Sequence, residues 1–432
     1  MTRPEERRSP PIWATLAPLA FVVAGAALRL SFPLDIEYKS DERGFFESAH
    51  AIAAGGPWPW IGFPSSVGAP ASPLPNWIFA LMARLFGAPT PPDLARCVQA
   101  LNVVALGVFA GGAMRMASPW RAAWLWAAAL WAVNPVAVIL ERKIWNPSLL
   151  PLPVVLLIFA WLQRKRWWAA FGWGLLGSLI VQIHIAGVFL VASLAAWTWA
   201  REPRAFPWLG WVAGSLVGAA SAVPWLEQLT HFHHFVGRKG LKPPYPGFYL
   251  RFFTQPFGFG SDYSLSRKTF MDFAAWPRIQ GGATWLVGLA HVALAAIAAT
   301  ALIRGARAFW AGVGFSWRSL VLGRDEADTL ICAVFWGYGG ILTLITIGSA
   351  GSERHYLELV APVMALWCAR LVLSSGGAWA RLLLPSLCAL QLAVSASLLV
   401  YIDQRQLIPG DYGTIWRAQT ASPAVGRNPS PG

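Results

Sequence analysis

The sequence predicts an all-α polytopic membrane protein with about 11 transmembrane helices. Hydrophobic residues make up 56% of the 432-residue chain and charged residues only 12%, which is more apolar surface than one soluble core of this length can hide. Apolar runs of near-spanning length recur along the chain. The 26 tryptophans fit this class, because an apolar ring with one N–H donor suits a membrane–water boundary.

The apolar runs give the positions of the spans. They lie near residues 12–32, 95–116, 120–139, 148–163, 167–183, 185–200, 206–223, 283–303, 328–348, 357–373 and 381–401. The stretch 167–200 is divided at "QIH", because about 34 apolar residues exceed one bilayer crossing. We assign residues 1–403 to the transmembrane domain and 404–432 to an outer, partly disordered C-terminal tail.

Short connections between the spans set the orientation. Basic clusters such as "QRKR" at 163–166 and "REPR" at 201–204 fall on the side of the N-terminus, which the positive-inside rule places in the cytoplasm. The first apolar run has no clear small-residue cleavage site, so we interpret it as an uncleaved span in the cytoplasmic (inner) membrane. The net charge of +14 is assigned to orientation and lipid contact, and no nucleic-acid-binding module is expected.

Three longer segments, 33–94, 134–147 and 224–282, fall on the outer side and also carry Lys and Arg. Charges in long loops contribute little to orientation. The Lys and Arg residues of these three segments therefore predict a positively lined outer cavity that holds an anion.

The first outer segment predicts two short amphipathic helices at the membrane surface. Ser40 is expected to cap the first, with Asp41 and Glu42 in its first turn, where the helix dipole favours negative charge. Gly55-Gly56 ends this helix, and the second runs over residues 76–87. Stabilisation of a helix start is one interpretation of the two acids.

Three stretches carry a family resemblance. They contain Asp41-Glu42, Phe45/Phe46, Gly55-Gly56, "SPLPN" at 72–76 and Phe86-Gly87, then "NPVAVILERKIWNPSLLPL" at 134–152, and later "SERHYLELVAP" at 352–362. In this order and spacing they resemble the GT-C superfamily of membrane glycosyltransferases. The similarity is closest to the branch with protein O-mannosyltransferases and lipid A aminoarabinose transferases. Ser72 stands where that branch usually has a lysine.

The resemblance implies an inverting glycosyltransferase that acts at the outer face of the membrane. It would move a sugar from a polyprenyl-phosphate donor to a lipid, glycan or protein acceptor. Asp41, which matches the family's first-loop acid, would take the acceptor's proton. Glu42 would orient this base or bind a metal, so a divalent cation is the one cofactor left open, and no metal ligands are assigned.

Cations would stabilise the charge that grows on the leaving phosphate. Arg142 and Lys143 follow Glu141 between apolar runs, and such an ionisable triplet is costly unless it meets water or a partner. Arg354 is a further candidate, and Tyr356 belongs to the same element. The two arginines are preferred to Lys143, because guanidinium suits bidentate phosphate binding. Snorkelling or a local salt bridge is the alternative for all three cations.

The remaining substrate-binding assignments are His184, Arg238 and Lys239. His184 lies at a predicted outer turn, where a helix-capping or hydrogen-bonded histidine is the alternative. Arg238 and Lys239 follow "HFHHF" at 231–235, whose histidines lack a further ligand at metal-site spacing. Asp35 and Glu37 are expected to be solvated loop acids.

Two other functions stay open from the sequence. A transporter or flippase of lipid-linked sugars would also need an anion-lined cavity, although no similar halves are evident. An O-antigen-type polymerase or ligase would share the polyprenyl carrier and act on longer glycans.

Overall fold

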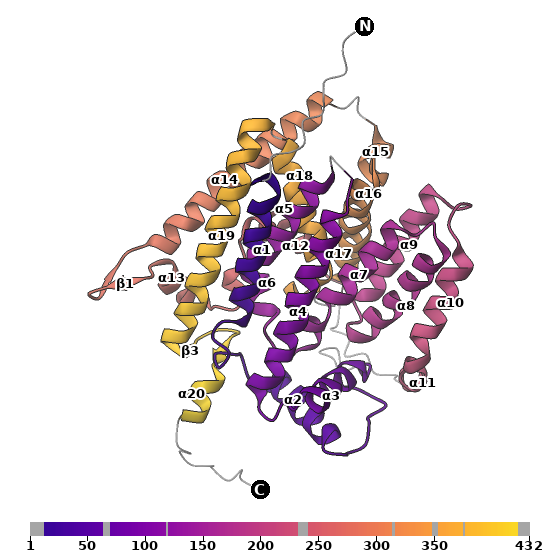
Figure 1. Cartoon of the computed structure of the whole chain (residues 1–432), viewed down its shortest axis with the longest axis horizontal. Coiled ribbons are helices and arrows are strands. Elements are labelled where there is room, and N and C mark those ends of the chain that lie inside the picture. The colour runs from indigo at the N-terminus through magenta and orange to yellow at the C-terminus, as the bar shows by residue number, and fades with distance from the viewer. Residues whose placement is uncertain are drawn as a thin grey trace.

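The computed structural model describes residues 13–63, 70–117, 120–231, 241–312, 316–347, 353–374 and 376–421. These residues form a helical bundle with two distinct ends (Figure 1). The short helices α2 (Ser40–Ala53) and α3 (Leu74–Phe86) lie at one end, and α15 (Trp317–Leu322) lies at the opposite end. On the predicted topology the first is the outer end and the second the inner end.

The long helices of the bundle have the following bounds. They are α1 (Trp13–Leu30), α4 (Pro91–Met114), α5 (Trp120–Val133), α7 (Pro151–Leu162), α8 (Trp167–Ile183), α9 (Gly187–Arg201), α10 (Trp208–Ala219), α14 (Leu286–Gly312), α18 (Ala361–Ser374) and α19 (Gly377–Arg405). One further long rod is formed by α16 (Glu326–Cys332), the π-helical segment η5 (Ala333–Tyr338) and α17 (Gly339–Ile345).

Shorter elements connect these helices. They are α6 (Pro135–Leu140), η1 (Asn146–Leu149), η2 (Ala220–Ala222), α11 (Val223–Thr230), α12 (Gly247–Thr254), η3 (Gln255–Phe257), η4 (Ser261–Tyr263), α13 (Arg267–Ala274), η6 (Arg354–Leu359) and α20 (Trp416–Ala421). Two small antiparallel hairpins pair β1 (Arg278–Ile279) with β2 (Gly282–Ala283), and β3 (Leu407–Ile408) with β4 (Gly413–Thr414).

Each of the eleven predicted spans contains a helix. Among the described residues, five helical stretches are long and apolar enough to cross a membrane by length and composition. Several others are shorter apolar helices, so the count of about 11 crossings stays a prediction. The predicted break at "QIH" is confirmed: α8 ends at Ile183 and His184 is extended.

The C-terminal ends of the two helices of the first outer segment agree with the sequence, whereas both helices begin earlier than predicted, α3 at Leu74 instead of residue 76. Gly55 and Gly87 have φ of +99° and +59° and end α2 and α3 as predicted. The expectation that Ser40 caps α2 is wrong, because the helix already begins at Ser40 and Lys39 is the capping residue. The Glu42 carboxylate accepts the Lys39 backbone N–H at 3.3 Å, which fixes the start one residue earlier.

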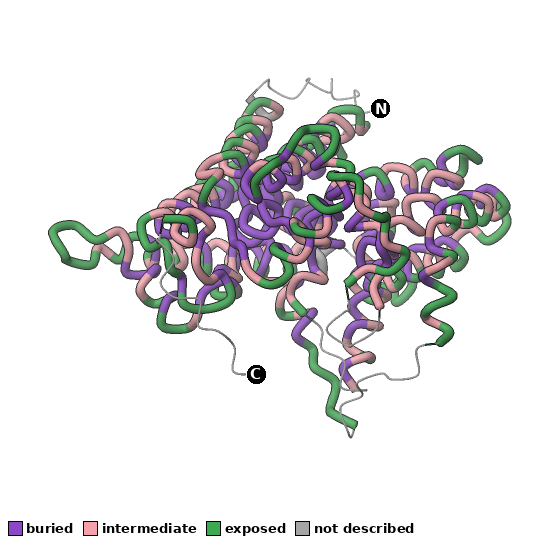
Figure 2. The backbone as a smooth tube through the Cα atoms, turned by 90° about the horizontal axis from the view of Figure 1, so that it is seen from below, coloured by how far each residue is buried: buried purple, intermediate pink, exposed green. Residues whose placement is uncertain are grey.

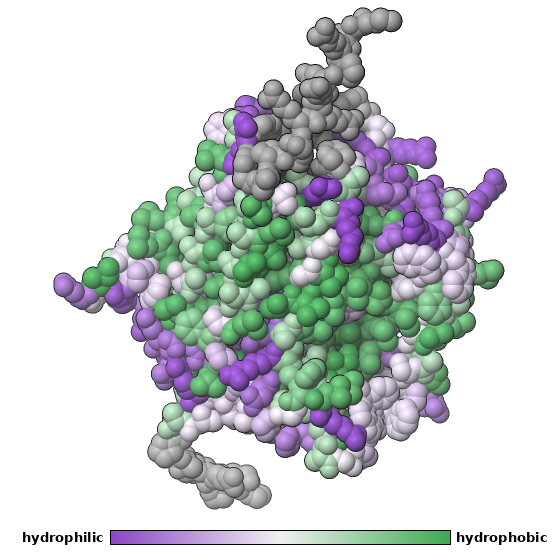
Figure 3. All heavy atoms as spheres, viewed as in Figure 1, coloured by the Kyte–Doolittle hydropathy of each residue, from purple (hydrophilic) through white to green (hydrophobic). Residues whose placement is uncertain are grey.

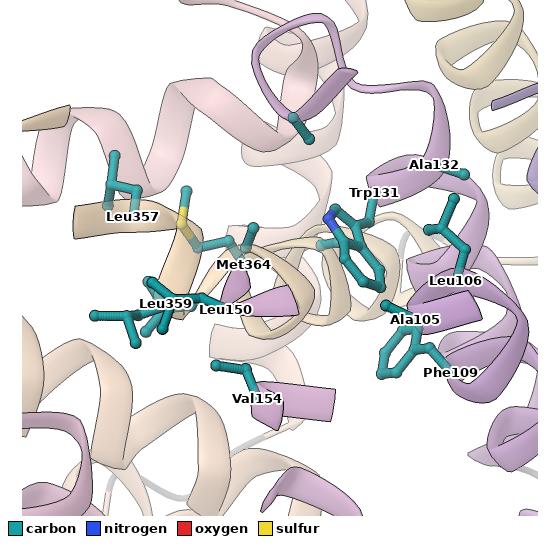
Figure 4. Packing of buried hydrophobic residues seen from close by; sticks show 14 of the residues in the cluster. Ala105, Leu106, Phe109, Trp131, Ala132, Leu150, Val154, Leu357, Leu359 and Met364 are labelled. Atoms are coloured by element: carbon teal, nitrogen blue, oxygen red, sulfur yellow. The ribbon is translucent and has the colours of Figure 1, made fainter. Parts of the chain in front are cut away.

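Buried residues gather in the middle of the molecule in Figure 2. They include every residue of α5 from Ala123 to Val133. Trp131 packs edge-on against Phe109 of α4, with 5.7 Å between ring centroids (Figure 4). On the outside, hydrophobic side chains cover the middle of the face in Figure 3, and hydrophilic ones gather toward its ends. This distribution is that of an integral membrane protein.

The C-terminal segment up to Ala421 is folded onto the first outer loop. The backbone N–H of Trp416 donates to the Ile36 carbonyl at 3.1 Å, and Ile415 forms a bridge with Glu37. Residues 34–39 are thus covered by a hairpin and helix that follow the last long helix. The end of the predicted tail, 422–432, lies outside the described residues.

Close contact between α8 and α10 depends on glycine. A Cβ atom on Gly214 of α10 would overlap the Phe171 carbonyl group, and one on Gly174 of α8 would overlap the Trp211 carbonyl oxygen. Small residues of this kind let two membrane helices approach backbone to backbone.

We predict that Gly214→Leu destabilises the protein by about 1–3 kcal/mol, because the added side chain pushes α10 away from α8. Thermal unfolding of the purified protein in detergent measures the effect. Gly172→Leu on α8 is the control, because a Cβ at Gly172 meets no atom within 4 Å. Equal melting temperatures for the two variants would contradict the prediction.

Candidate active site

Three consecutive charged residues, Glu141, Arg142 and Lys143, are all buried after α6. The Glu141 carboxylate accepts from Arg29 Nε of α1 at 2.6 Å, and both side chains are fully buried. The indole N–H of Trp131 donates to the other carboxylate oxygen at 2.8 Å. Glu141 is therefore paired and hydrogen-bonded, as a buried charge requires.

Arg142 points to the end of α1. Its Nη2 donates to the carbonyls of Ser31 and Phe32, the latter at 2.9 Å. These contacts hold the first outer loop against the second. Whether Arg142 also binds a substrate phosphate stays a prediction.

Lys143 lies between two carboxylates of the first outer loop. Its Nζ is 2.7 Å from Glu37 and 3.4 Å from Glu42, and the other Glu37 oxygen is 2.7 Å from Lys39 Nζ. Burial raises the pKa of Glu37 to about 7, although Lys143 opposes the change. Burial alone would lower the pKa of Lys143, but the carboxylates of Glu37 and Glu42 outweigh it and raise that pKa.

The expectation that Asp35 and Glu37 are solvated is wrong, since they are only 3% and 2% exposed. Asp35 pairs with Arg417 at 3.2 Å, and its backbone carbonyl accepts from the Tyr412 hydroxyl at 2.6 Å. Burial raises the pKa of Asp35 to about 6, against the influence of Arg417. Both acids lie under the C-terminal segment, and no feature near them in the sequence indicates this cover.

The structure separates the two predicted catalytic acids. Helix α2 buries the face that carries Glu42, Phe45 and Ala49, so the Glu42 carboxylate turns toward Lys143. Asp41 lies outside this face and is exposed. Their predicted roles as base and neighbour remain proposals, but their environments are now distinct.

A cluster of aromatic rings lies next to Lys143, whose Nζ is 4.6 Å from the Trp145 ring centre. The His355 ring follows at 4.8 Å from Trp145, and the His184 ring lies 5.3 Å from His355 and 5.1 Å from Tyr356. The predicted residues Lys143, His184 and Tyr356 are therefore brought together from three distant segments.

Both histidines of this cluster are neutral at pH 7. Burial lowers the pKa of His184 to about 4. The pKa of His355 is also well below its usual value because of burial, with His184 and Lys143 adding to the effect. His184 Nδ1 accepts the Ala186 backbone N–H at 3.3 Å, so Nε2 carries the proton. The hydrogen-bonded histidine considered from the sequence is what the structure contains.

Arg354 connects this end of the bundle to the long loop that follows α11. Its Nη1 donates to the Gly260 carbonyl and lies 3.2 Å from the Asp262 carboxylate. Its side chain is 16% exposed, against 5% for Lys143. Arg238 and Lys239, the other predicted phosphate contacts, lie outside the described residues.

Sequence reasoning did not find Glu37, Trp145, His355 or Glu358. Within the described part of the chain, neither oxygen of the buried Glu358 carboxylate has a hydrogen-bond partner. The triplet at 141–143 could have indicated Glu37, because buried charges require partners of opposite sign and the nearest acids in the first outer segment are candidates for that role.

In the described ranges, no group of three or more His, Cys, Asp or Glu side chains is placed to hold a metal. The carboxylates of Glu37 and Glu42 already face the ammonium of Lys143. The positive charge that a divalent ion would bring between them is thus supplied by the protein itself.

No protein-family model and no curated protein matches this chain. Its fold is similar to the crystal structure of ArnT from Cupriavidus metallidurans in the apo state, with a TM-score of 0.51 and 13% identity over 83% of this chain. The match covers 60% of that protein, so this chain spans less than two thirds of it. ArnT from the same organism bound to undecaprenyl phosphate aligns with a TM-score of 0.44 and 12% identity, covering 90% of this chain and 79% of that chain.

The comparison bears on the fold alone. The helical fold shared with the apo ArnT structure agrees with the fold expected from the three motifs. The mannosyltransferase side of that branch stays a prediction.

We predict that Arg29→Met destabilises the protein by about 3–5 kcal/mol, because it leaves the Glu141 carboxylate buried without a counter-charge. The double variant Arg29→Met/Glu141→Leu should lose less than the single variant. Denaturant unfolding in detergent measures both. Arg96→Met is the control, because it breaks only a partly exposed ion pair with Asp93, and it should lower the free energy of unfolding by less than about 1 kcal/mol. A loss as small as this for Arg29→Met would contradict the prediction.

Glu37 should make stability depend on pH. Its pKa is about 7 in the folded protein against 4.5 for a free side chain, so the folded state binds more protons than the unfolded state between these values. The contribution to stability is present at low pH and is lost as pH rises from about 4.5 to 7, by up to about 3 kcal/mol.

The measurement is the difference in unfolding free energy between the wild type and Glu37→Gln from pH 5 to pH 8. As the pH rises, the free energy of unfolding of Glu37→Gln should increase relative to that of the wild type. Glu47→Gln, at an exposed position of α2, should run parallel to the wild type. Parallel curves for Glu37→Gln as well would refute the assignment.

Proposed function

We propose that this protein is an inverting glycosyltransferase that uses a polyprenyl-phosphate sugar donor at the outer face of the cytoplasmic membrane. One observation carries the proposal: the three segments with GT-C-like motifs meet around Lys143. Residues 37–42 supply its ion pairs, residues 141–148 supply Lys143 and Trp145, and residues 354–356 supply His355 and Tyr356.

In this reaction the acceptor's hydroxyl oxygen forms a bond to the anomeric carbon of the donor sugar. The bond from that carbon to the lipid phosphate oxygen breaks, and the phosphate leaves with the electron pair. The acceptor's proton passes to a carboxylate. A single displacement of this kind inverts the anomeric configuration.

Asp41 suits the role of base, because its carboxylate is exposed and can meet an acceptor. Glu42 suits a positioning role, because its carboxylate faces Lys143 and accepts the N–H that begins α2. The ion pair fixes the first turn of the helix that carries Asp41. A base held on a fixed turn loses little entropy when the acceptor arrives.

Arg354 is the cation we propose first for the leaving phosphate. Its side chain is more exposed than that of Lys143, and a guanidinium binds phosphate oxygens in pairs. Lys143, Arg142, Arg238 and Lys239 would add positive potential around the same anion. The adjacent rings of Tyr356 and His184 would pack against the sugar, and their polar atoms would form hydrogen bonds with its hydroxyl groups.

The donor's chain would lie in the bilayer beside the apolar helices, with its phosphate at the end of the bundle that carries α2. ArnT, whose apo structure shares the fold, has been crystallised with undecaprenyl phosphate, so we propose this class of lipid as the first donor to assay. The acceptor we propose is a lipid, glycan or protein on the same side of the membrane.

We predict that Asp41→Asn lowers sugar transfer at least about 100-fold, because the amide cannot take the acceptor's proton. The assay supplies purified protein with labelled polyprenyl-phosphate sugars and membrane-lipid or peptide acceptors. Donor binding and thermal stability should match the wild type. Glu47→Gln, also exposed on α2, should keep full activity.

Full activity in Asp41→Asn would rule out the base assignment. If the wild type moves donor across vesicles and transfers no sugar, the protein is a transporter and the proposed reaction is wrong.

A further inference from the structure

A cavity of about 390 Å³ reaches the end of the bundle that carries α15, which is the predicted inner end. Its walls come from α12, α14, α15, α16 with η5, and α18. This volume is within the range of ligand-binding sites. The proposed transfer reaction makes no use of it.

The cavity has an apolar part and a polar part. The apolar part is lined by aromatic side chains of three elements, Phe252, Phe253, Phe335, Trp336 and Trp367. The polar part lies near the ends of α15, α16 and α18 and contains Ser319, Arg324, Asp328, Arg370 and Ser374. We call this cavity the inner groove.

The π-helical segment η5 forms one wall of the inner groove. It places Phe335 and Trp336 on the cavity, and the Trp336 indole N–H donates to the Leu320 carbonyl of α15 at 3.0 Å. Short π-helical segments within α-helices occur frequently at functional sites. This wall is therefore a second feature that indicates a binding site.

Small residues of α14 form part of the wall of the groove. A Cβ on Gly305 would overlap the Leu371 side chain of α18, so glycine allows the two helices to meet at that level. Ala308, three residues on, lines the cavity. A larger side chain at Ala308 would enter the groove directly.

We propose that the inner groove binds an anionic phospholipid of the leaflet at the inner end, with a hydrocarbon chain among the aromatic rings and the phosphate at Arg324 and Arg370. Membrane lipids are the molecules at this depth that combine a long apolar chain with a charged head. The aromatic lining matches the chain, and the polar part lies at the helix ends, where head groups are found.

Charge favours an anionic head group. The charged side chains that line the groove are two arginines, Arg324 and Arg370, and one acid, Asp328. Arg370 is held by Asp325 and Asp328, each at 2.8 Å, and both ion pairs use Nη2. A guanidinium has five N–H donors, so a phosphate can bind without displacing these carboxylates.

The test measures lipid retention by the purified full-length chain with native mass spectrometry. The probes are phosphatidylglycerol, phosphatidylcholine and uncharged diacylglycerol with the same chains. We expect phosphatidylglycerol to bind at least about tenfold more tightly than diacylglycerol. Equal binding of the three would overturn the proposal, as would a folded wild type that retains none of them.

Two pairs of variants locate the site. Ala308→Trp fills the groove and should abolish retention of phosphatidylglycerol, whereas Ala306→Trp, at an exposed position of the same helix, should keep it. Arg324→Gln should weaken phosphatidylglycerol about tenfold and leave diacylglycerol unchanged, whereas Arg318→Gln, exposed on α15, should match the wild type.

Thermal unfolding shows that each variant is folded before lipids are compared. Unchanged retention in Ala308→Trp would place the lipid elsewhere and overturn the proposal. Because the readout is lipid binding, a failure of the proposed sugar transfer would leave this result unaffected.

Discussion

The burial of Glu141, Arg142 and Lys143 is the constraint on which the end of the bundle that carries α2 depends. Three consecutive charges cannot leave water without compensation, because an unpaired buried charge costs several kcal/mol. Each finds a partner on a different part of the first 42 residues: Arg29 within α1, the carbonyls that end α1, and the carboxylates of Glu37 and Glu42. The first outer loop is therefore fixed onto the second by charge.

The C-terminal segment completes this arrangement. Its hairpin and α20 cover residues 34–39, and Arg417 supplies a counter-charge to the buried Asp35. Asp411 adds an ion pair to Lys39. With this cover in place, Glu37 is removed from water and its pKa rises. The electrostatics around Lys143 thus depend on residues at both ends of the chain.

The two acids of the first loop illustrate how one turn of helix can separate two tasks. Adjacent residues in a helix point about 100° apart, so α2 can bury Glu42 against Lys143 and leave Asp41 exposed. The buried acid holds the helix, and the exposed one is free to meet a substrate. At the opposite end of the bundle, α14 and the π-helical segment η5 contribute walls to the inner groove.

The sequence by itself determined the helical membrane class, the helix in each predicted span, the break at "QIH" and the glycine ends of α2 and α3, because each depends on apolar content or on local backbone preference. The family motifs also indicated that Lys143 and Tyr356 belong to one region, and the break at "QIH" indicated a turn at His184. Only the tertiary structure decided that Asp35 and Glu37 are buried, that Lys39 rather than Ser40 precedes α2, and that His355 and Trp145 join the cluster. The reason is physical: burial depends on what covers a residue, and for Asp35 the cover is Tyr412 and Arg417, which the fold brings back from the far end of the chain.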